Sequence, residues 1–568
     1  MAIISAALIQ RPTAPDANSH LSGGMGGLEG RVGWPVYAVD SSPLHAVTLT
    51  DAFPVSAGLG SIAVEKRISY VDDFYNRIHI SPKELRLGNV ASTQSVPVYI
   101  WNAYFETRTL EAIEGLDEGV LLDGEPEPPL LFGPLQEREW QLSVTPAGQP
   151  TLDLVIDWQF SGGDVVGLHV TANRIVAWAF VPDWQDGILE RLTFATDILQ
   201  SESAVEQRRA IRLAPRREFE APMYVEGRER QLLDLMLFGW GERLWALPIW
   251  HEIQLLQEDL AIGADFIPCS TEHLDFHADG LALLRSESAF VCETVEVDEV
   301  TPAGLQLKRS MLQGWPAGSR LYPARTAQLV EQPSLTRLTD QAIQADVRFL
   351  VMEPCDWPAV LPSTLYRGRP VFDATPDESE DLSATFARLT STFDQGGGLP
   401  LTTDTAARGL TVLGQRWLDL GRAARGELRS FIYAMNGRQK AVWVPTHAGD
   451  LTLAGTVTSV ATVIDIDLIG YTRFAAARPG RRDIRIQLTD GAVFFRRILA
   501  ATELDADTER LSLNAALGRL VEPSDVARIS WMVCCRFDSD TVEIEHQTDS
   551  EGVASSAFTF RETRDDEL

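Results

Sequence analysis

The chain contains very little lysine and an excess of acid. Of its 49 basic residues only four are lysines (Lys66, Lys83, Lys308 and Lys440), and 80 acidic residues give a formal net charge of −31 at pH 7. A surface that binds nucleic acid needs clustered basic side chains for its phosphate contacts, so this balance argues against such a surface. Arginine supplies most of the positive charge, and its planar guanidinium suits bidentate pairs with carboxylates.

Cysteines and long apolar runs are also scarce. Five cysteines in 568 residues are too few and too scattered for a disulfide framework. The sequence has no run of about 18 apolar residues, the length that a membrane-spanning helix requires. The opening MAIISAALIQRP lacks the charged and apolar regions of a signal peptide. We therefore expect a protein that is made in a reducing cytoplasm and has no membrane span.

Catalytic motifs are missing as well. The sequence has no nucleophile elbow, phosphate-binding loop or dinucleotide fingerprint, and paired carboxylates are expected by chance among 80 acids. We therefore predict no enzyme activity, no catalytic residue and no cofactor.

The best metal candidate is the segment CSTEHLDFHAD (269–279), which offers Cys269, His273 and His277. However, it lacks the paired-cysteine and HExxH spacings of zinc sites, and strand alternation would place its histidines on one solvated face. The vicinal Cys534 and Cys535 would point to opposite faces of a strand, which favours buried thiols over metal ligands. We predict no metal site.

An internal repeat is the strongest positive signal. RIVAWAFVPDW (174–184) resembles RFLVMEPCDW (348–357), and LLDLMLFGWGERLWALPIW (232–250) resembles ELRSFIYAMNGRQKAVWVPTH (427–447). A third pair, beginning at Gly304 and Glu509, preserves the order. Each second copy of these segments lies roughly 170 to 210 residues after the first. Preserved order with drifting spacing indicates a duplicated module with loop insertions.

Each proposed copy has the same local pattern. A strand leads into an apolar helix that stops at Gly or Asn-Gly, and an aromatic strand ending at proline follows. Short alternating strands come next, which is typical of a small antiparallel barrel. Before the first copy, alternating runs from Ile78 onward indicate a β-sandwich. Within that part, ISPKELRLGNVASTQSVPVYIWN (80–102) resembles immunoglobulin-like domains of the major-sperm-protein type, which are adhesion or spacer units.

The predicted fold class is therefore mainly β with a few helices, an Ig-like β-sandwich followed by a duplicated strand–helix–strand module plus small β-barrel. The predicted domains are an N-terminal arm (1–70), the Ig-like sandwich (71–163), module A (164–255), small barrel A (256–330), module B (331–450), small barrel B (451–545) and an acidic C-terminal tail (546–568).

Three segments carry a resemblance to a known family: 206–227, 236–250 and 428–451. They resemble tail-tip proteins of long-tailed bacteriophages, of the distal-tail or hub kind, over roughly residues 165–545. In those proteins a strand with an R-x-F pattern precedes a helix, a G-R turn and an aromatic strand that ends at proline. The resemblance implies a structural component of the virion tail, synthesised in the host cytoplasm, that joins the tail tube to fibres and lets DNA pass. It transfers no catalytic residue, and the Ig-like domain departs from the family's pattern.

The doubling also predicts an oligomer. Two modules per chain would complete a sixfold ring with three chains, so we predict a homotrimer, with a hexamer as the alternative. Trp245, Trp250 and Trp443 lie at the ends of the repeated strands and are candidate subunit-interface anchors, because tryptophan dominates interface hot spots. Burial beneath the sheets is the other interpretation of each.

Two further features bear on function. An acidic chain suits a channel that repels phosphate, and the other expected partners are tail-tip, tail-tube and tail-fibre proteins. The alternative function is a cell-surface carbohydrate-binding or adhesion protein, in which the Ig-like domain and exposed aromatic side chains contact a cell.

Overall fold

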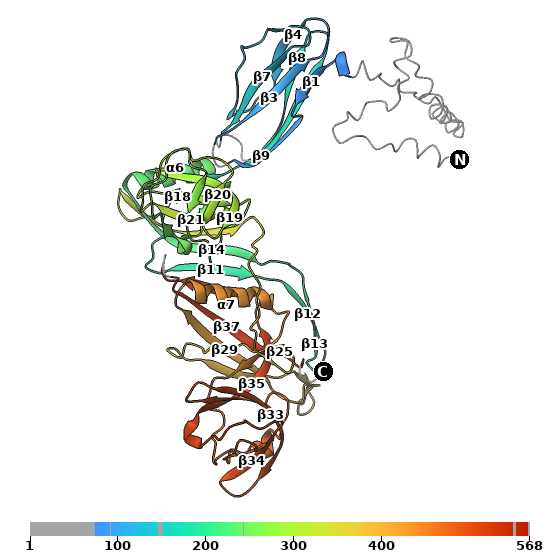
Figure 1. The fold of residues 1–568 in the computed structure, drawn as a ribbon. Helices are drawn as coiled ribbons and strands as arrows, with labels where there is room; N and C mark the ends of the chain where they lie inside the picture. Colours follow the sequence, from blue (N-terminus) through green and yellow to red (C-terminus); the bar gives the residue numbers. More distant parts are fainter. Residues whose placement is uncertain are drawn as a thin grey trace, which may run out of the picture. The chain divides into compact units, whose positions relative to one another are not determined.

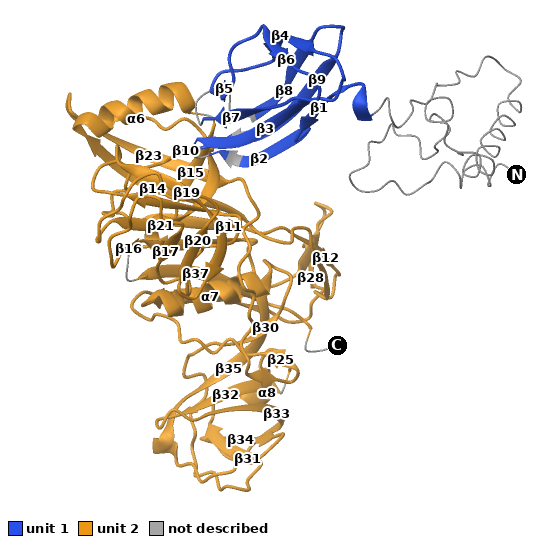
Figure 2. Cartoon of the chain, turned by 45° about the horizontal axis from the view of Figure 1, so that its top comes forward, with its two compact units in different colours: residues 1–175 blue, residues 176–568 orange. Residues whose placement is uncertain are grey.

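The computed structural model describes residues 74–90, 93–145, 151–241, 243–476, 478–548 and 552–565. These residues are mainly β (Figure 1), which confirms the predicted fold class. Their helices are α6 (Gly227–Trp240), α7 (Arg422–Met435) and α8 (Tyr471–Phe474). The chain divides into two compact units, 1–175 and 176–568 (Figure 2). Each described helix is too short or too polar to cross a membrane. The predicted N-terminal arm, 1–70, lies outside the described residues.

The described part of the first unit is a β-sandwich. One sheet has the order β1-β3-β7-β5 and the other has the order β2-β9-β8-β4-β6. Alternate side chains of both sheets meet in one core that includes Trp140 and Trp158. Because β9 pairs with both β2 and β8, the sandwich extends past the predicted boundary at residue 163. Its strands are β1 (Ile78–Ser81), β2 (Glu84–Val90), β3 (Gln94–Asn102), β4 (Arg108–Glu114), β5 (Val120–Asp123), β6 (Leu130–Phe132), β7 (Glu137–Val144), β8 (Thr151–Phe160) and β9 (Val165–Arg174).

The second unit contains one topology twice, which we call repeat 1 (176–351) and repeat 2 (365–562). The strands of repeat 1 are β10 (Val176–Ala177), β11 (Ile188–Thr193), β12 (Thr196–Gln200), β13 (Glu206–Ala210), β14 (Arg216–Glu226), β15 (Leu244–Pro248), β16 (Gln254–Leu255), β17 (Phe266–Pro268), β18 (Leu281–Arg285), β19 (Cys292–Thr301), β20 (Gly304–Leu307), β21 (Arg320–Leu329), β22 (Thr336–Arg337) and β23 (Ala342–Val351), with the short helix η2 (Trp250–Glu252).

Repeat 2 follows largely the same order, after a short hairpin of its own at the start. Its strands are β24 (Leu365–Tyr366), β25 (Arg369–Pro370), β26 (Ser383–Ala387), β27 (Thr390–Phe393), β28 (Leu401–Asp404), β29 (Leu410–Asp419), β30 (Val442–Pro445), β31 (Val463–Asp467), β32 (Asp483–Leu488), β33 (Val493–Glu503), β34 (Thr508–Leu513), β35 (Val526–Phe537), β36 (Thr541–His546) and β37 (Ala554–Glu562), with the short helix η3 (Pro523–Asp525).

Strand pairing shows how closely the two repeats correspond. In repeat 1, β14 leads into α6 and pairs with β11 and β23, while β15 pairs with β21. In repeat 2, β29 leads into α7 and pairs with β26 and β37, while β30 pairs with β35. The small sheets also match, since β17 to β21 and β31 to β35 have the same pairings. Even a register shift recurs, after Val297 in β19 and after Ile498 in β33.

The structure corrects several details of the predicted duplication. The first sequence pair is not equivalent, because Val176 of β10 runs parallel to β15, whereas Arg348 to Val351 belong to β23, which pairs with β14 and β21. Strand β23 therefore closes repeat 1 although it lies inside predicted module B. The predicted acidic tail contains β37, whose alternating ASSAFTF sequence places it between β29, β35 and β36.

A continuous sheet joins the two repeats. Strand β36 of repeat 2 pairs with β37 on one side and with β11 of repeat 1 on the other. A hairpin arm, β12–β13, leaves repeat 1 and packs its turn residue Ala204 against Ala406 and Leu410 of repeat 2. Repeat 2 has the corresponding arm, β27–β28, whose strands are almost entirely exposed.

Candidate functional site: a pocket and a buried charge cluster in corresponding positions

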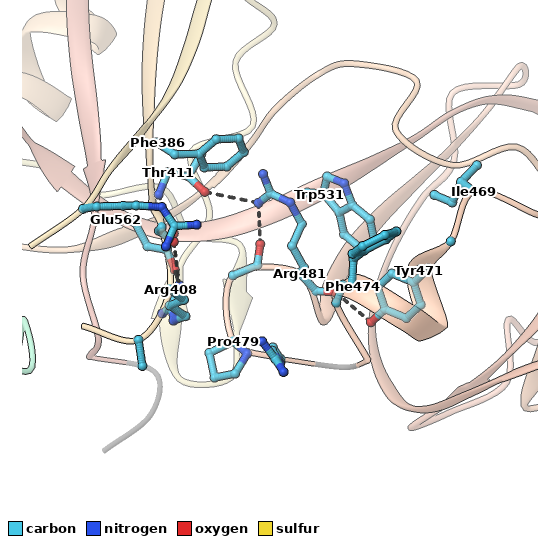
Figure 3. A pocket seen from close by; sticks show the side chains of 17 residues that line it. Phe386, Arg408, Thr411, Ile469, Tyr471, Phe474, Pro479, Arg481, Trp531 and Glu562 are labelled. Atoms are coloured by element: carbon cyan, nitrogen blue, oxygen red, sulfur yellow. Dashed lines mark hydrogen bonds and ion pairs between the residues drawn. The ribbon is translucent and has the colours of Figure 1, made fainter. Parts of the chain in front are cut away.

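Repeat 2 contains a pocket of about 410 Å³ between β26, β29 and the loop that joins β31 to β32 (Figure 3). Its walls combine aromatic and basic side chains: Phe386, Tyr471, Phe474, Trp531, Arg388, Arg408, Arg478 and Arg481. The guanidinium of Arg481 lies 5.3 Å from the Phe386 ring centre and 5.7 Å from that of Trp531, and it donates to Thr411 Oγ1 at 3.2 Å. Glu562 is the acidic lining residue, and it pairs with Arg408.

Charged side chains fill the corresponding place in repeat 1. Arg217 of β14 lies opposite Leu192, as Thr411 of β29 lies opposite Phe386. Arg217 donates from Nε to Glu190 Oε1 at 2.5 Å, and it also pairs with Asp275 from the loop between β17 and β18. Arg217 and Asp275 thus correspond to Thr411 and the Arg481 loop of repeat 2.

Repeat 1 also supplies Arg325, which pairs with Asp275, and repeat 2 supplies two further cations of this cluster. Arg429 of α7 lies 3.5 Å from carboxylate oxygens of both Glu190 and Glu252, and 3.8 Å from Asp275. Arg425, one helical turn earlier, donates to the carbonyl of His251 at 3.2 Å. We define the buried charge cluster as Glu190, Arg217, His251, Glu252, Asp275, Arg325, Arg425, Arg429 and His546, all of which are buried.

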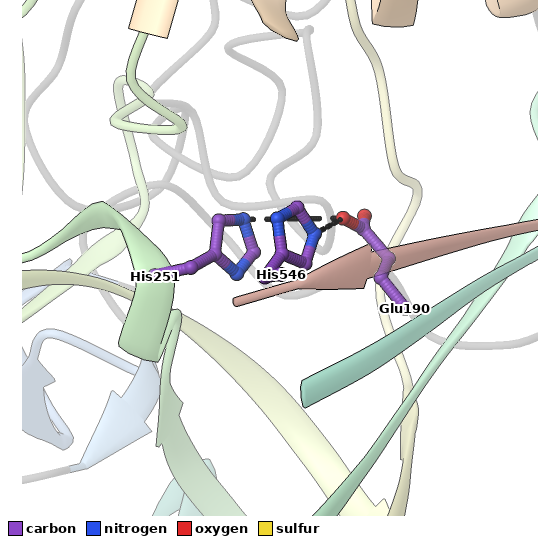
Figure 4. A group of neighbouring side chains, drawn as sticks. All are labelled: Glu190, His251 and His546. Atoms are coloured by element: carbon purple, nitrogen blue, oxygen red, sulfur yellow. Dashed lines mark hydrogen bonds and ion pairs between the residues drawn. The ribbon is translucent and has the colours of Figure 1, made fainter. Parts of the chain in front are cut away.

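Two histidines stack within the cluster (Figure 4). The rings of His251, from η2, and His546, from β36, are parallel within 3° with their centres 3.4 Å apart. His546 Nε2 lies 2.8 Å from Glu190 Oε2. Because Glu190 is ionised between two arginines, the neutral His546 carries its proton on Nε2 and donates it to this carboxylate.

Burial and neighbouring charges set the protonation of the cluster. Burial raises the pKa of Glu190, but Arg217 and Arg429 outweigh it and hold that pKa well below its usual value. Burial lowers the pKa of His546 to about 4, and burial together with His546 and Arg425 holds the pKa of His251 well below its usual range. Both imidazoles are therefore neutral at pH 7, and the charge is carried by arginine and carboxylate.

A metal ion fits this arrangement poorly. Among the described residues, Glu190, His251 and His546 are the group that places three ligand atoms within 4.8 Å. However, face-to-face imidazoles do not direct their nitrogen lone pairs to one point, and Arg217 and Arg429 already neutralise Glu190 and would repel a cation. The geometry favours a structural role for the cluster, which links repeat 1 to repeat 2. Breaking one of its ion pairs would leave a buried charge uncompensated.

The residues of the best metal candidate in the sequence lie apart from that group. Cys269 is partly buried, and burial raises the pKa of its thiol to about 12, which favours the neutral form over the thiolate that binds metal. His277 Nε2 lies 3.2 Å from Nη1 of Arg325 and accepts a hydrogen bond from this guanidinium. His273 lies beside α7, where a Cβ added at Gly426 would come within 3.0 Å of its Nδ1.

The predicted interface tryptophans are core residues. Trp245 and Trp250 are 0% and 2% exposed and pack in the core beneath α6. Trp443 is 2% exposed and packs with Tyr366 and Val371 on the other face of its strand. Their indoles therefore have no free surface for another subunit, and the anchor role predicted for them is wrong because the neighbouring sheets already cover them.

Sequence reasoning missed the cluster. The dipeptide His251-Glu252 has no second histidine nearby in the sequence, and the structure supplies His546 from 295 positions later. The available signal was the pair Arg425 and Arg429 at an i,i+4 spacing on a helix whose neighbours are buried. Two arginines on a buried helix require carboxylate partners, although the sequence does not say which ones.

No protein-family model matches the chain, and comparison with curated proteins gives no match either. Among solved structures, a PapD-like (ASH) domain of human CEP192 aligns with 21% of this chain and 99% of that domain, at 10% identity and a TM-score of 0.15. The secreted serine protease VesC from Vibrio cholerae aligns with 50% of this chain and 51% of that chain, at 6% identity and a TM-score of 0.16. At these TM-scores neither match bears on function.

Proposed function

We propose that the chain is a structural component of a bacteriophage tail tip or baseplate, assembled as a homotrimer in which six repeats form one ring. The observation that carries the proposal is the duplicated topology of repeats 1 and 2, joined edge to edge by β11 and β36. Two copies of one module in a chain halve the number of chains that a sixfold ring needs. The resemblance of segments 206–227, 236–250 and 428–451 to tail-tip proteins supports the same function.

The interior of the second unit supports a building role. Nine buried charged or imidazole side chains lie where the two repeats meet, and ion pairs such as Arg217–Glu190 and Arg325–Asp275 join partners of the same chain. An acidic chain with a net charge of −31 suits a channel that passes DNA without binding it. Tail-tube and tail-fibre proteins would be its neighbours.

Electron microscopy tests the proposal. Purified protein should form rings or threefold hubs in negative stain, and an antibody against it should label one end of phage tails from a producing host. Monomers that bind glycans would contradict the proposal and favour the adhesion alternative.

A further inference from the structure

Among the described residues of the second unit, nothing covers the outer face of α6, although the same face of α7 is buried. Both helices have 14 residues and follow equivalent strands, so their positions can be matched one by one. In α7 the fourth, eighth and twelfth residues are Arg425, Arg429 and Tyr433, and all three are buried against repeat 1 or within the cluster. The matching residues of α6 are Arg230, Asp234 and Phe238.

The residues of α6 are much more exposed than the matching residues of α7. Leu233 is the single buried residue of α6, whereas nine residues of α7 are buried. Phe238 is 93% exposed, while its counterpart Tyr433 is 8% exposed. An exposed phenylalanine on a helix face whose counterpart lies in an interface marks a surface without a partner among the described residues of the second unit.

The matching surface of repeat 2 is also uncovered in the part of the second unit that the structure describes. Strand β11 of repeat 1 pairs on both sides, with β14 and β36, but β26 pairs within the described residues on one side, with β29. Next to β26 is the pocket of Figure 3, which occupies the position that α7 and its arginines cover in repeat 1. Strand β22, the counterpart of β36, pairs on one side with β23.

We propose that α6 and β22 of one copy of the chain dock on the pocket and the β26 edge of repeat 2 in a second copy, repeating between chains the contact that α7 and β36 make within one chain. The proposal rests on the homo-oligomeric assembly proposed above and assigns its interface. The pairs Leu189–Glu545 and Ile188–His546 set the register inside the chain. Their counterparts place Ser383 opposite Thr336, and Leu382 opposite Arg337, of the second copy.

Charge complementarity supports this occupant. Inside the chain, repeat 1 presents the carboxylates of Glu190, Glu252 and Asp275, and α7 brings Arg425 and Arg429. The central pair is reversed at the open site: the pocket presents Arg478 and Arg481, and α6 brings Asp234 at the place of Arg429. The fourth helix position is arginine in both helices, Arg230 in α6 and Arg425 in α7. The reversal makes α7 a poor fit for the pocket, because like charges would meet. The charges therefore favour assemblies in which repeat 1 of one chain contacts repeat 2 of the next chain.

A pair of cysteines tests the geometry. Tyr433 and Phe194 lie in contact inside the chain, with ring centres 6.1 Å apart, and their counterparts are Phe238 and Arg388. Oxidation should link Phe238→Cys of one chain to Arg388→Cys of another, giving covalent dimers when the two single variants are mixed. Each single variant alone should stay unlinked. Self-linking of Phe238→Cys, or no link in the mixture, would overturn the proposal.

Charge exchange tests the chemistry without disturbing the fold, since Asp234 and Arg478 are exposed. Asp234→Arg should weaken self-association about tenfold by placing like charges together, and adding Arg478→Asp should restore it. The control is Asp298→Arg, which makes the same charge change on an exposed part of β19 and should leave association unchanged. Equal effects of Asp234→Arg and the control, or no rescue, would contradict the docking. Antibody labelling of phage tails reports separately, so the docking can fail while the tail-tip function stands.

Discussion

Helices α6 and α7 have the same length and the same place in their repeats, yet α7 is largely buried and α6 is largely exposed. The difference comes from the neighbour and not from the repeat. Helix α7 lies between its own sheet and repeat 1, and its arginines form ion pairs with the carboxylates of repeat 1. Helix α6 carries Asp234 and Phe238 at the matching places, and these side chains have no such neighbour within the described residues. The outer face of α6 is therefore the one that we propose binds a second copy of the chain.

The largest effect should follow from removing the central arginine of α7. Arg429→Ala should lower the free energy of unfolding by about 3–5 kcal/mol, because it leaves Glu190, Glu252 and Asp275 buried with one cation fewer. The matched change in α6, Asp234→Ala, should alter it by less than about 0.5 kcal/mol, because Asp234 is exposed. Urea unfolding measures both. Similar losses for the two variants would show that the helices are not in different environments.

Acidification should weaken the same cluster, by a somewhat smaller amount. The pKa of His546 is about 4 in the folded chain, against a usual 6.5, so the unfolded chain binds more protons between these values. Stability should therefore be complete above pH 6.5 and fall as the pH drops towards 4, by up to about 3 kcal/mol for this group. His251, whose pKa is also lowered, acts in the same direction, and Glu190 titrates further down.

The variant His546→Gln separates this contribution from the rest. Its unfolding free energy should depend less steeply on pH between 6.5 and 4.5, because one proton-binding difference is removed. A slope identical to that of the unchanged chain would show that His546 does not carry the acid sensitivity.

The two hairpin arms offer a third comparison, with a smaller expected effect. Glu206 of the β12–β13 arm accepts two bonds of 2.8 Å from the buried Arg536 of repeat 2. Glu206→Ala should therefore cost about 2 kcal/mol, because Arg536 stays buried without this partner. Asp404→Ala in the β27–β28 arm breaks an exposed pair with Arg388 and should cost less than about 1 kcal/mol. Thermal unfolding measures the stability of both variants. A larger loss of stability for Asp404→Ala than for Glu206→Ala would show that the β27–β28 arm, and not the β12–β13 arm, is the one held by the rest of the chain.

The sequence allowed the duplicated order to be predicted because its signals are local. An apolar helix, a glycine or asparagine stop and an aromatic strand recur within about 20 residues in both repeats. The register between the repeats was not predictable. Trp245 and Trp443 occupy equivalent strands but face opposite cores, and strands buried on both faces have no period-2 pattern that would reveal the one-residue shift.

The buried charge cluster was out of reach for a different reason. Its members lie between residues 190 and 546, so their partnership depends on how β11 meets β36 and α7. A single sequence with 80 acids offers many carboxylates for each arginine, and burial alone selects among them. The predicted boundary between small barrel B and the acidic tail was wrong for the same reason. Strand β37 follows an acidic stretch but pairs with three neighbouring strands.

A reconstruction of the assembled protein by electron cryo-microscopy tests the central claim most directly. The account predicts that repeats 1 and 2 alternate around the symmetry axis, with α6 of each chain seated on the Arg478 and Arg481 pocket of the next and β22 extending the β26 edge. An assembly in which like repeats meet, or in which Phe238 stays exposed to solvent, would contradict it.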